Sequence, residues 1–126
     1  MTMIDEYEQQ QRRLARRQEA LRRLTADVRH LVSQPPASAV WHRTKTDLVE
    51  MVNLAWGTHE ITDEYGRPRK RADLARRAFR AVGLDAPHSL THWVWKINNR
   101  TTDRRSVLRT YLRDTASPSP PDTPTR

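Results

Sequence analysis

Residues 41–57 read WHRTKTDLVEMVNLAWG and carry the clearest helical pattern of the chain. Apolar side chains recur there at the spacing of one buried helix face, at Leu48, Met51, Val52, Ala55 and Trp56. Thr44 or Thr46 can cap the beginning of such a helix, and Gly57 favours its end. We therefore predict a helix over residues 48–56, packed by one face against a core.

Two further helical patterns lie on either side of Gly83. Residues 71–82 place Leu74, Ala75, Ala78, Phe79 and Val82 on one face. The opposite face carries Arg76, Arg77 and Arg80. Gly83 ends this helix, because glycine adopts the left-handed conformation found at helix ends. Ser89 can then cap a helix over residues 90–98 whose buried side holds Leu90, Trp93, Val94 and Ile97.

The last helical pattern follows residue 101. Thr102 and Asp103 can cap it, and Val107, Leu108, Tyr111 and Leu112 form its apolar side. Residues 115–126 are mostly Ser, Thr and Pro, which cannot build a core, so we predict a disordered tail.

Residues 57–70 show no helical pattern. Ile61 is their single aliphatic residue, so this segment could supply one short strand or one buried plug. Residues 63–68, Asp-Glu-Tyr-Gly-Arg-Pro, have the composition of a turn. We expect the cations that follow to be exposed and within reach of a phosphate backbone; they are Arg67, Arg69, Lys70 and Arg71.

The chain begins with one long helical pattern, from residue 3 to residue 33, which contains neither Gly nor Pro. A heptad runs through Tyr7, Leu14, Leu21 and Val28, joined by Leu24 and Leu31 in the second half only. Two interpretations stay open: a helix packed on its own domain, or a short coiled coil that makes a homodimer. Pro35 and Pro36 end the helix. The predicted organisation is a long helix over 1–33, a hinge over 34–40, a helical domain over 41–114 and the tail.

Composition excludes several classes of protein. The 126 residues include no cysteine, so neither disulfides nor thiolate metal sites contribute. No apolar run is long enough to span a membrane, and the acidic beginning does not resemble a signal peptide, so we expect a cytoplasmic protein. There is no glycine-rich phosphate loop, and the five histidines are scattered. We expect no enzyme activity, metal, cofactor or small-molecule substrate.

Positive charge is concentrated in the second half of the chain. Residues 67–113 hold 13 Arg and Lys but only three acids, whereas the remaining residues hold 10 basic and 12 acidic ones. A GC-rich genome would explain why 20 of the 23 basic residues are Arg, but it would not explain the missing acids. A compact basic region attracts phosphates, so the pattern favours binding to a polyanion.

Two helices around a Gly83 turn, the second polar and basic outward, suggest a helix-turn-helix. In that motif the second helix enters the major groove of duplex DNA, and neighbouring cations hold phosphates. The candidate groove residues are Thr91, His92, Trp95, Lys96 and Asn99. The candidate flanking residues are Arg76, Arg77, Arg80, Arg100, Arg104 and Arg105.

Several of these residues also have a structural interpretation. Trp95 could pack on the last helix, and Asn98 and Asn99 could end their own helix. The arginines could be plain solvated surface. Binding of single-stranded nucleic acid is a further alternative, but Trp93 lies on the apolar face, so Trp95 alone could stack on a base.

The core resembles the C-terminal half of the RteC family, proteins tied to bacterial conjugative transposons. The most specific element is residues 45–50, Lys-Thr-Asp-Leu-Val-Glu, with Trp41 nearby. Looser landmarks follow, at Ile61, Gly66, Asp73-Leu74-Ala75, Phe79, Gly83-Leu84 and Lys96-Ile97-Asn98-Asn99-Arg100. Longer members of that family carry an N-terminal domain where this chain has a single helix.

The resemblance implies a winged-helix-like domain that binds DNA upstream of an excision operon and activates it. Its recognition helix would correspond to residues 89–99. We therefore expect a mostly α fold, a small winged-helix/helix-turn-helix-like bundle preceded by one long N-terminal helix. We expect the protein to be a sequence-specific regulator that binds double-stranded DNA and controls transcription of a bacterial mobile element. The alternative is a protein-interaction adaptor of the element that uses the N-terminal helix.

Overall fold

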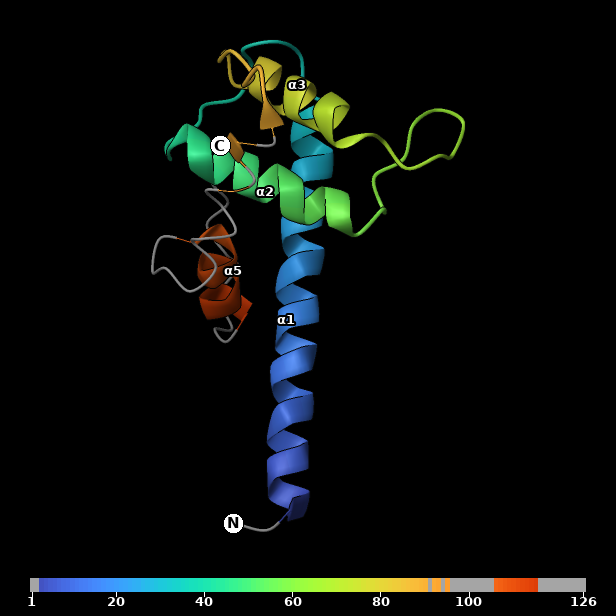
Figure 1. The fold of residues 1–126 in the computed structure, drawn as a ribbon, viewed down its shortest axis with the longest axis vertical. Coiled ribbons are helices and arrows are strands. Elements are labelled where there is room, and N and C mark those ends of the chain that lie inside the picture. Colours follow the sequence, from blue (N-terminus) through green and yellow to red (C-terminus); the bar gives the residue numbers. More distant parts are fainter. Residues whose placement is uncertain (1–2, 91, 94, 96–105, 116–126) are drawn as a thin grey trace.

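The computed structural model describes residues 3–90, 92, 93, 95 and 106–115. Within these residues the named elements are four helices, α1 (Met3–Val32), α2 (Lys45–Gly57), α3 (Arg71–Ala81) and α5 (Val107–Thr115) (Figure 1). Leu90, His92, Trp93 and Trp95 are also helical. The β structure in this part of the chain is one isolated bridge, between Thr62 and Pro68. The expected mostly helical class is confirmed.

The two halves of α1 have different surroundings. Residues 4–18 are exposed along their whole length, and this half extends past the other helices (Figure 1). From residue 20 onward, one face contributes fully buried side chains to the core, at Ala20, Leu24, Val28 and Leu31. That half packs against α2, α3 and α5. The apolar heptad of the second half is therefore used inside the domain, as the first of the two interpretations required.

Helix α2 contributes its apolar face to the core and packs against α1, α3 and α5. Leu48, Met51 and Ala55 are completely buried. Thr44 is the cap: its hydroxyl accepts from the Asp47 N–H at 3.1 Å, and the Asp47 carboxylate accepts from the Thr44 N–H at 3.3 Å. The helix ends at Gly57 as predicted, but the left-handed residue that follows is His59, with φ of 58°.

Helix α3 ends in a Schellman motif built on Gly83. The glycine has φ of 72°, and its N–H donates to the Arg80 carbonyl at 3.1 Å. The N–H of Leu84 donates to the Phe79 carbonyl at 2.9 Å. Leu84 is half-buried and packs against the core. The turn at Gly83 was thus correctly predicted from its residue type.

The segment over residues 34–40 is anchored to the end of α3. The Ala37 N–H donates to the Arg80 carbonyl at 2.9 Å, and the Ala39 N–H donates to the Ala81 carbonyl at 3.0 Å. The Ala81 carbonyl thus gains a donor at the end of the helix, and the Arg80 carbonyl, which already accepts from Gly83, gains a second one. Because α1 packs in the same core as α2 and α3, this segment connects two helices of a single core.

The connection between α2 and α3 forms a projecting loop (Figure 1). Ile61 is 4% exposed, so it is the buried plug rather than part of a longer strand. The Asp63 carboxylate accepts from the Tyr65 and Arg67 N–H groups at 2.9 and 3.0 Å, which holds the predicted turn. Arg67 and Lys70 are exposed as expected. The same expectation was wrong for Arg69 and Arg71, which are half-buried because each binds another side chain.

Helix α5 begins later than predicted. Ser106 is not helical, and the first helical residue of this element is Val107. The acceptor at its beginning is the carboxylate of Glu50 in α2, which the Val107 N–H meets at 3.1 Å. Thr102, Asp103 and the tail over residues 116–126 lie outside the described residues. Among the described helices none is long and apolar enough to cross a membrane.

Candidate nucleic-acid interface

The outward face of α3 carries four charged residues at helical spacing. Leu74, Ala75, Ala78 and Phe79 are buried, so the spacing i, i+3, i+4, i+7 directs the other face outward, with Asp73, Arg76, Arg77 and Arg80. The sequence correctly predicted this division, because the apolar positions alone fix which face is buried.

Asp73 binds three guanidinium groups at once. Its carboxylate accepts from Arg69 at 2.9 Å, from Arg76 at 2.5 Å and from Arg77 at 3.1 Å. Arg69 comes from the loop before α3, and the other two come from the next turn of the helix. The side chain of Arg76 is 68% exposed, against 22% for Arg69 and 33% for Arg77, so Arg76 is the outermost member. We call these four residues the Asp73 cluster.

The Asp73 cluster retains a positive charge and unused donors. Three arginines against one aspartate leave a net charge of +2. Burial alone would raise the pKa of Asp73, but hydrogen bonds from Arg69 and Arg77, together with their charges, outweigh it and hold the pKa below its usual value. The aspartate therefore stays ionised at neutral pH. Each guanidinium has several N–H groups, and those not directed at Asp73 remain available to a phosphate oxygen.

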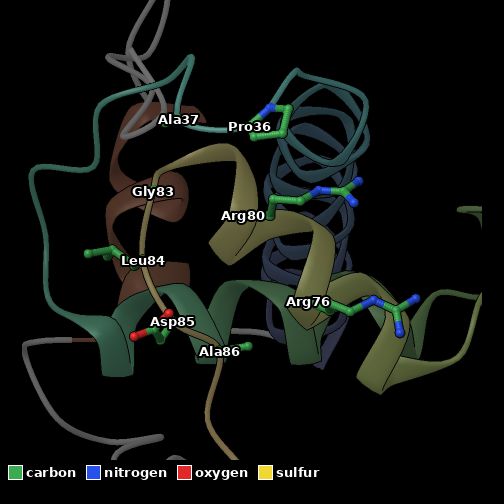
Figure 2. A pocket seen from close by; sticks show the side chains of 8 residues that line it. All are labelled: Pro36, Ala37, Arg76, Arg80, Gly83, Leu84, Asp85 and Ala86. Atoms are coloured by element: carbon green, nitrogen blue, oxygen red, sulfur yellow. The ribbon is translucent and has the colours of Figure 1, made fainter.

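Arg80 extends this cationic face by one helical turn. It is exposed, and within the part of the chain that the structure describes no ion pair includes it. Arg76 and Arg80 border a shallow, open pocket of about 350 Å³ between α3, Pro36 and residues 83–86. Figure 2 shows their side chains leaving α3 in the same direction, on the opposite side of the pocket from Asp85. The two guanidinium groups are thus presented together to solvent.

A second arginine contact joins the beginning of α3 to α2. The guanidinium of Arg71 lies 4.9 Å from the centre of the Trp56 ring and donates to the Asn53 side chain at 3.3 Å. The rings of His59 and Trp56 meet in an edge-to-face arrangement, with centroids 5.9 Å apart. Sequence analysis placed Trp56 on the buried stripe and Arg71 among the exposed cations. It had no signal for their contact, because the intervening loop brings them together.

The predicted recognition helix is described at four of its positions. His92 is exposed, and Trp95 is 66% exposed, so Trp95 is not packed into the core. Trp93 is half-buried and packs against the core, as its place on the apolar face predicted. Thr91, Lys96, Asn98, Asn99, Arg100, Arg104 and Arg105 lie outside the described residues. The structure therefore brings Arg76, Arg77 and Arg80 onto one face and leaves His92 and Trp95 accessible.

Two buried or half-buried carboxylates hold the framework behind this face. Glu50, 4% exposed, accepts from the Ser106 hydroxyl at 2.6 Å as well as from Val107. Asp27 in α1 accepts a short hydrogen bond from the Tyr111 hydroxyl in α5. Burial raises the pKa of Asp27, although the bond from Tyr111 and the nearby charge of His30 act in the opposite direction. In the described residues no three His, Asp or Glu side chains are grouped as metal ligands.

No protein-family model, curated protein or solved structure matches this chain.

Proposed function

We propose that the protein binds double-stranded DNA as a sequence-specific transcriptional regulator, with the outward face of α3 on the phosphate backbone. The observation that carries the proposal is the Asp73 cluster, a group of three arginines held by one carboxylate with a net charge of +2. One carboxylate balances only one of the three cations, so positive charge remains on this face for a ligand to neutralise. Its unused donors match the oxygens of phosphate.

Groove contacts would come from the helix that follows Gly83. The exposure of Trp95 and His92 supports this part of the proposal, because both side chains are accessible to a ligand. Thr91, Lys96 and Asn99 are proposed as groove residues, and Arg100, Arg104 and Arg105 as backbone contacts, on their sequence positions. The winged-helix-like arrangement is part of the same proposal. The loop closed by the Thr62–Pro68 bridge exposes Arg67, and Lys70 is exposed just after it, so we assign further backbone contacts to this segment.

The regulated genes would belong to a bacterial mobile element, whose excision or transfer the protein would control. This step rests on the resemblance of residues 41–113 to the RteC family.

The first test compares two double variants that remove the same charge. Arg76→Ala with Arg80→Ala removes two exposed cations from α3, and Arg16→Ala with Arg17→Ala removes two from the exposed half of α1. The slope of log K against log salt changes by about 0.9 for each phosphate that the protein no longer neutralises. The α3 variant should make that slope shallower by roughly twice this amount, and the α1 variant should leave it unchanged. Equal effects of the two variants on duplex binding would overturn the proposal.

The second test addresses base recognition. Selection of bound sequences from a random duplex pool should return a preferred site. Lys96→Ala should then weaken binding to that site by about 1–3 kcal/mol while binding to other sequences changes little. A uniform loss on every sequence would instead place Lys96 on a phosphate.

One observation favours the second candidate function, an interaction adaptor. The exposed half of α1 presents Ile4, Tyr7 and Leu14, which are 69%, 62% and 46% exposed. A helix of this kind could bind a protein partner through its apolar side, and such binding would depend only weakly on salt. Duplex binding that falls steeply with salt favours the regulator, whereas no duplex binding would favour the adaptor.

A further inference from the structure

The exposed half of α1 is a helix without a partner in its own domain. Residues 4–18 are exposed on every side and extend for roughly 22 Å. Ile4, Tyr7 and Leu14 nevertheless lie on one side of it, together with Gln11, at positions that repeat every three or four residues. Isolated helices of this length are marginal in water, so contact with a second helix would stabilise it.

Charges in this half are separated along the helix. Asp5, Glu6 and Glu8 come first, and Arg12, Arg13, Arg16 and Arg17 follow. Farther along, Glu19 already binds Arg22 at 2.6 Å and Arg23 at 3.1 Å. Within the described chain, by contrast, no ion pair includes Glu6, Glu8, Arg12 or Arg13. Glu6 and Glu8 are therefore complementary in charge to Arg12 and Arg13, and these four residues form no ion pair within the described helix.

We propose that this half of α1 pairs with the same half of a second copy of the chain, in antiparallel orientation. Ile4 of one copy then faces Leu14 of the other, and Tyr7 faces Gln11, so each apolar layer occurs twice by symmetry. On one flank, Glu8 of each copy approaches Arg12 of the other, and Glu6 lies level with Arg12 and Arg13 of the other copy on the outer side of the pair. Both acidic stretches are thus matched by basic ones.

The exposed range and the charges favour this arrangement over others. In a parallel pair, like charges of the two copies would face each other at both ends, which is unfavourable. In the antiparallel pair, the helix of the second copy reaches its beginning near residue 15 of the first. It therefore ends before Ala20, where α1 enters the core. The two domains lie at opposite ends and do not collide.

The interface is short, so association should be weak and concentration-dependent. Two copies held close together, for example on one ligand, would pair much more readily. The inference does not depend on DNA binding, because self-association is measured with the protein alone.

The first experiment is sedimentation equilibrium of the full chain with charge-reversed variants. Glu6→Arg alone and Arg13→Glu alone should each weaken dimerisation severalfold, because each turns an attraction between the copies into a repulsion at both symmetric positions. An equimolar mixture of the two variants should restore wild-type association, since every pair is again opposite in sign. A wild-type chain that stays monomeric at all concentrations, or a mixture no better than the single variants, would overturn the proposal.

The second experiment determines orientation by cross-linking, which is clean because the chain has no cysteine. Ile4→Cys mixed with Leu14→Cys should give a disulfide-linked heterodimer, and Ile4→Cys alone should not cross-link. Efficient linking of Ile4→Cys to itself would instead show a parallel pair. Both positions are exposed in the monomer, so the substitutions should leave the unfolding transition unchanged.

Discussion

The carboxylate of Glu50, in α2, accepts a hydrogen bond from the backbone N–H of Val107, the first residue of α5, at 3.1 Å. It also accepts from the Ser106 hydroxyl at 2.6 Å. The buried Glu50 side chain thus accepts a backbone N–H at the beginning of α5, which is normally the role of a neighbouring N-cap residue. Its negative charge also lies at the positive end of the helix dipole. The contact connects the centre of the core to the last described helix.

We predict that Glu50→Ala destabilises the protein. The substitution leaves the Ser106 hydroxyl and the Val107 N–H without this acceptor in a buried site, which costs about 1–3 kcal/mol. Urea unfolding of the full chain measures the change. Glu64→Ala is the matched control, because Glu64 is exposed in the loop and its loss should change stability by less than about 0.5 kcal/mol. Equal stability of the two variants would contradict the capping role of Glu50.

Gly83 and Gly57 should respond in opposite ways to alanine. At Gly83 a new Cβ would lie 3.3 Å from the Cβ of Ala37, and φ of 72° strains any side chain. Gly83→Ala should therefore lower the free energy of unfolding by about 1–2 kcal/mol. At Gly57 a Cβ meets nothing within 4 Å, and the residue is helical. Gly57→Ala should leave stability unchanged or raise it by up to about 1 kcal/mol, as thermal unfolding can show.

The pairs that sequence analysis predicted are the ones fixed by local spacing. Capping preferences gave Thr44 as one of two candidate caps, and they identified Gly83 because it directly follows an apolar stripe; the reciprocal bond between Thr44 and Asp47 was not predicted. The buried face of α3 likewise follows from its period, and with it the outward direction of Arg76, Arg77 and Arg80.

The pairs that were missed join residues far apart in sequence. Glu50 and Val107 meet only because α2 and α5 pack together, so capping preferences had pointed to Thr102 and Asp103 instead. The same holds for Tyr111 with Asp27, and for Arg71 on Trp56. The sharing of Asp73 by three arginines is local, but its spacing fits a solvated surface equally well. The site could therefore be predicted as a basic face, but not as an organised cluster.

The pKa values of Asp27 and Asp73 are shifted in opposite directions, so the two residues should make opposite contributions to the pH dependence of the free energy of unfolding. Asp27 has a pKa raised above its usual 3.8, first because of burial, so its contribution is complete below that value and is lost as pH rises through the folded-state pKa. Asp73 has a pKa below 3.8 despite burial, because Arg69 and Arg77 donate to it. Its contribution is present above that value and is lost as pH falls through the folded-state pKa.

Asp27→Asn and Asp73→Asn separate these contributions when the free energy of unfolding is followed from about pH 2 to about pH 7. The deficit of Asp27→Asn relative to the wild type should shrink as pH rises, whereas the deficit of Asp73→Asn should grow. If both deficits change in the same direction, either the burial of Asp27 or the hydrogen bonds to Asp73 cannot have the predicted effect on its pKa.

We predict that Trp93 contributes to stability, whereas the nearby Trp95 contributes to DNA binding. Trp93 is half-buried against the core, so Trp93→Ala should lower the free energy of unfolding by about 2–4 kcal/mol. Trp95 is 66% exposed, so Trp95→Ala should leave stability within about 0.5 kcal/mol of the wild type. If the helix after Gly83 enters the DNA groove, Trp95→Ala should weaken duplex binding at least about tenfold. Urea unfolding and fluorescence-anisotropy titration with a labelled duplex measure the two effects, and unchanged duplex affinity of Trp95→Ala would remove this residue from the groove.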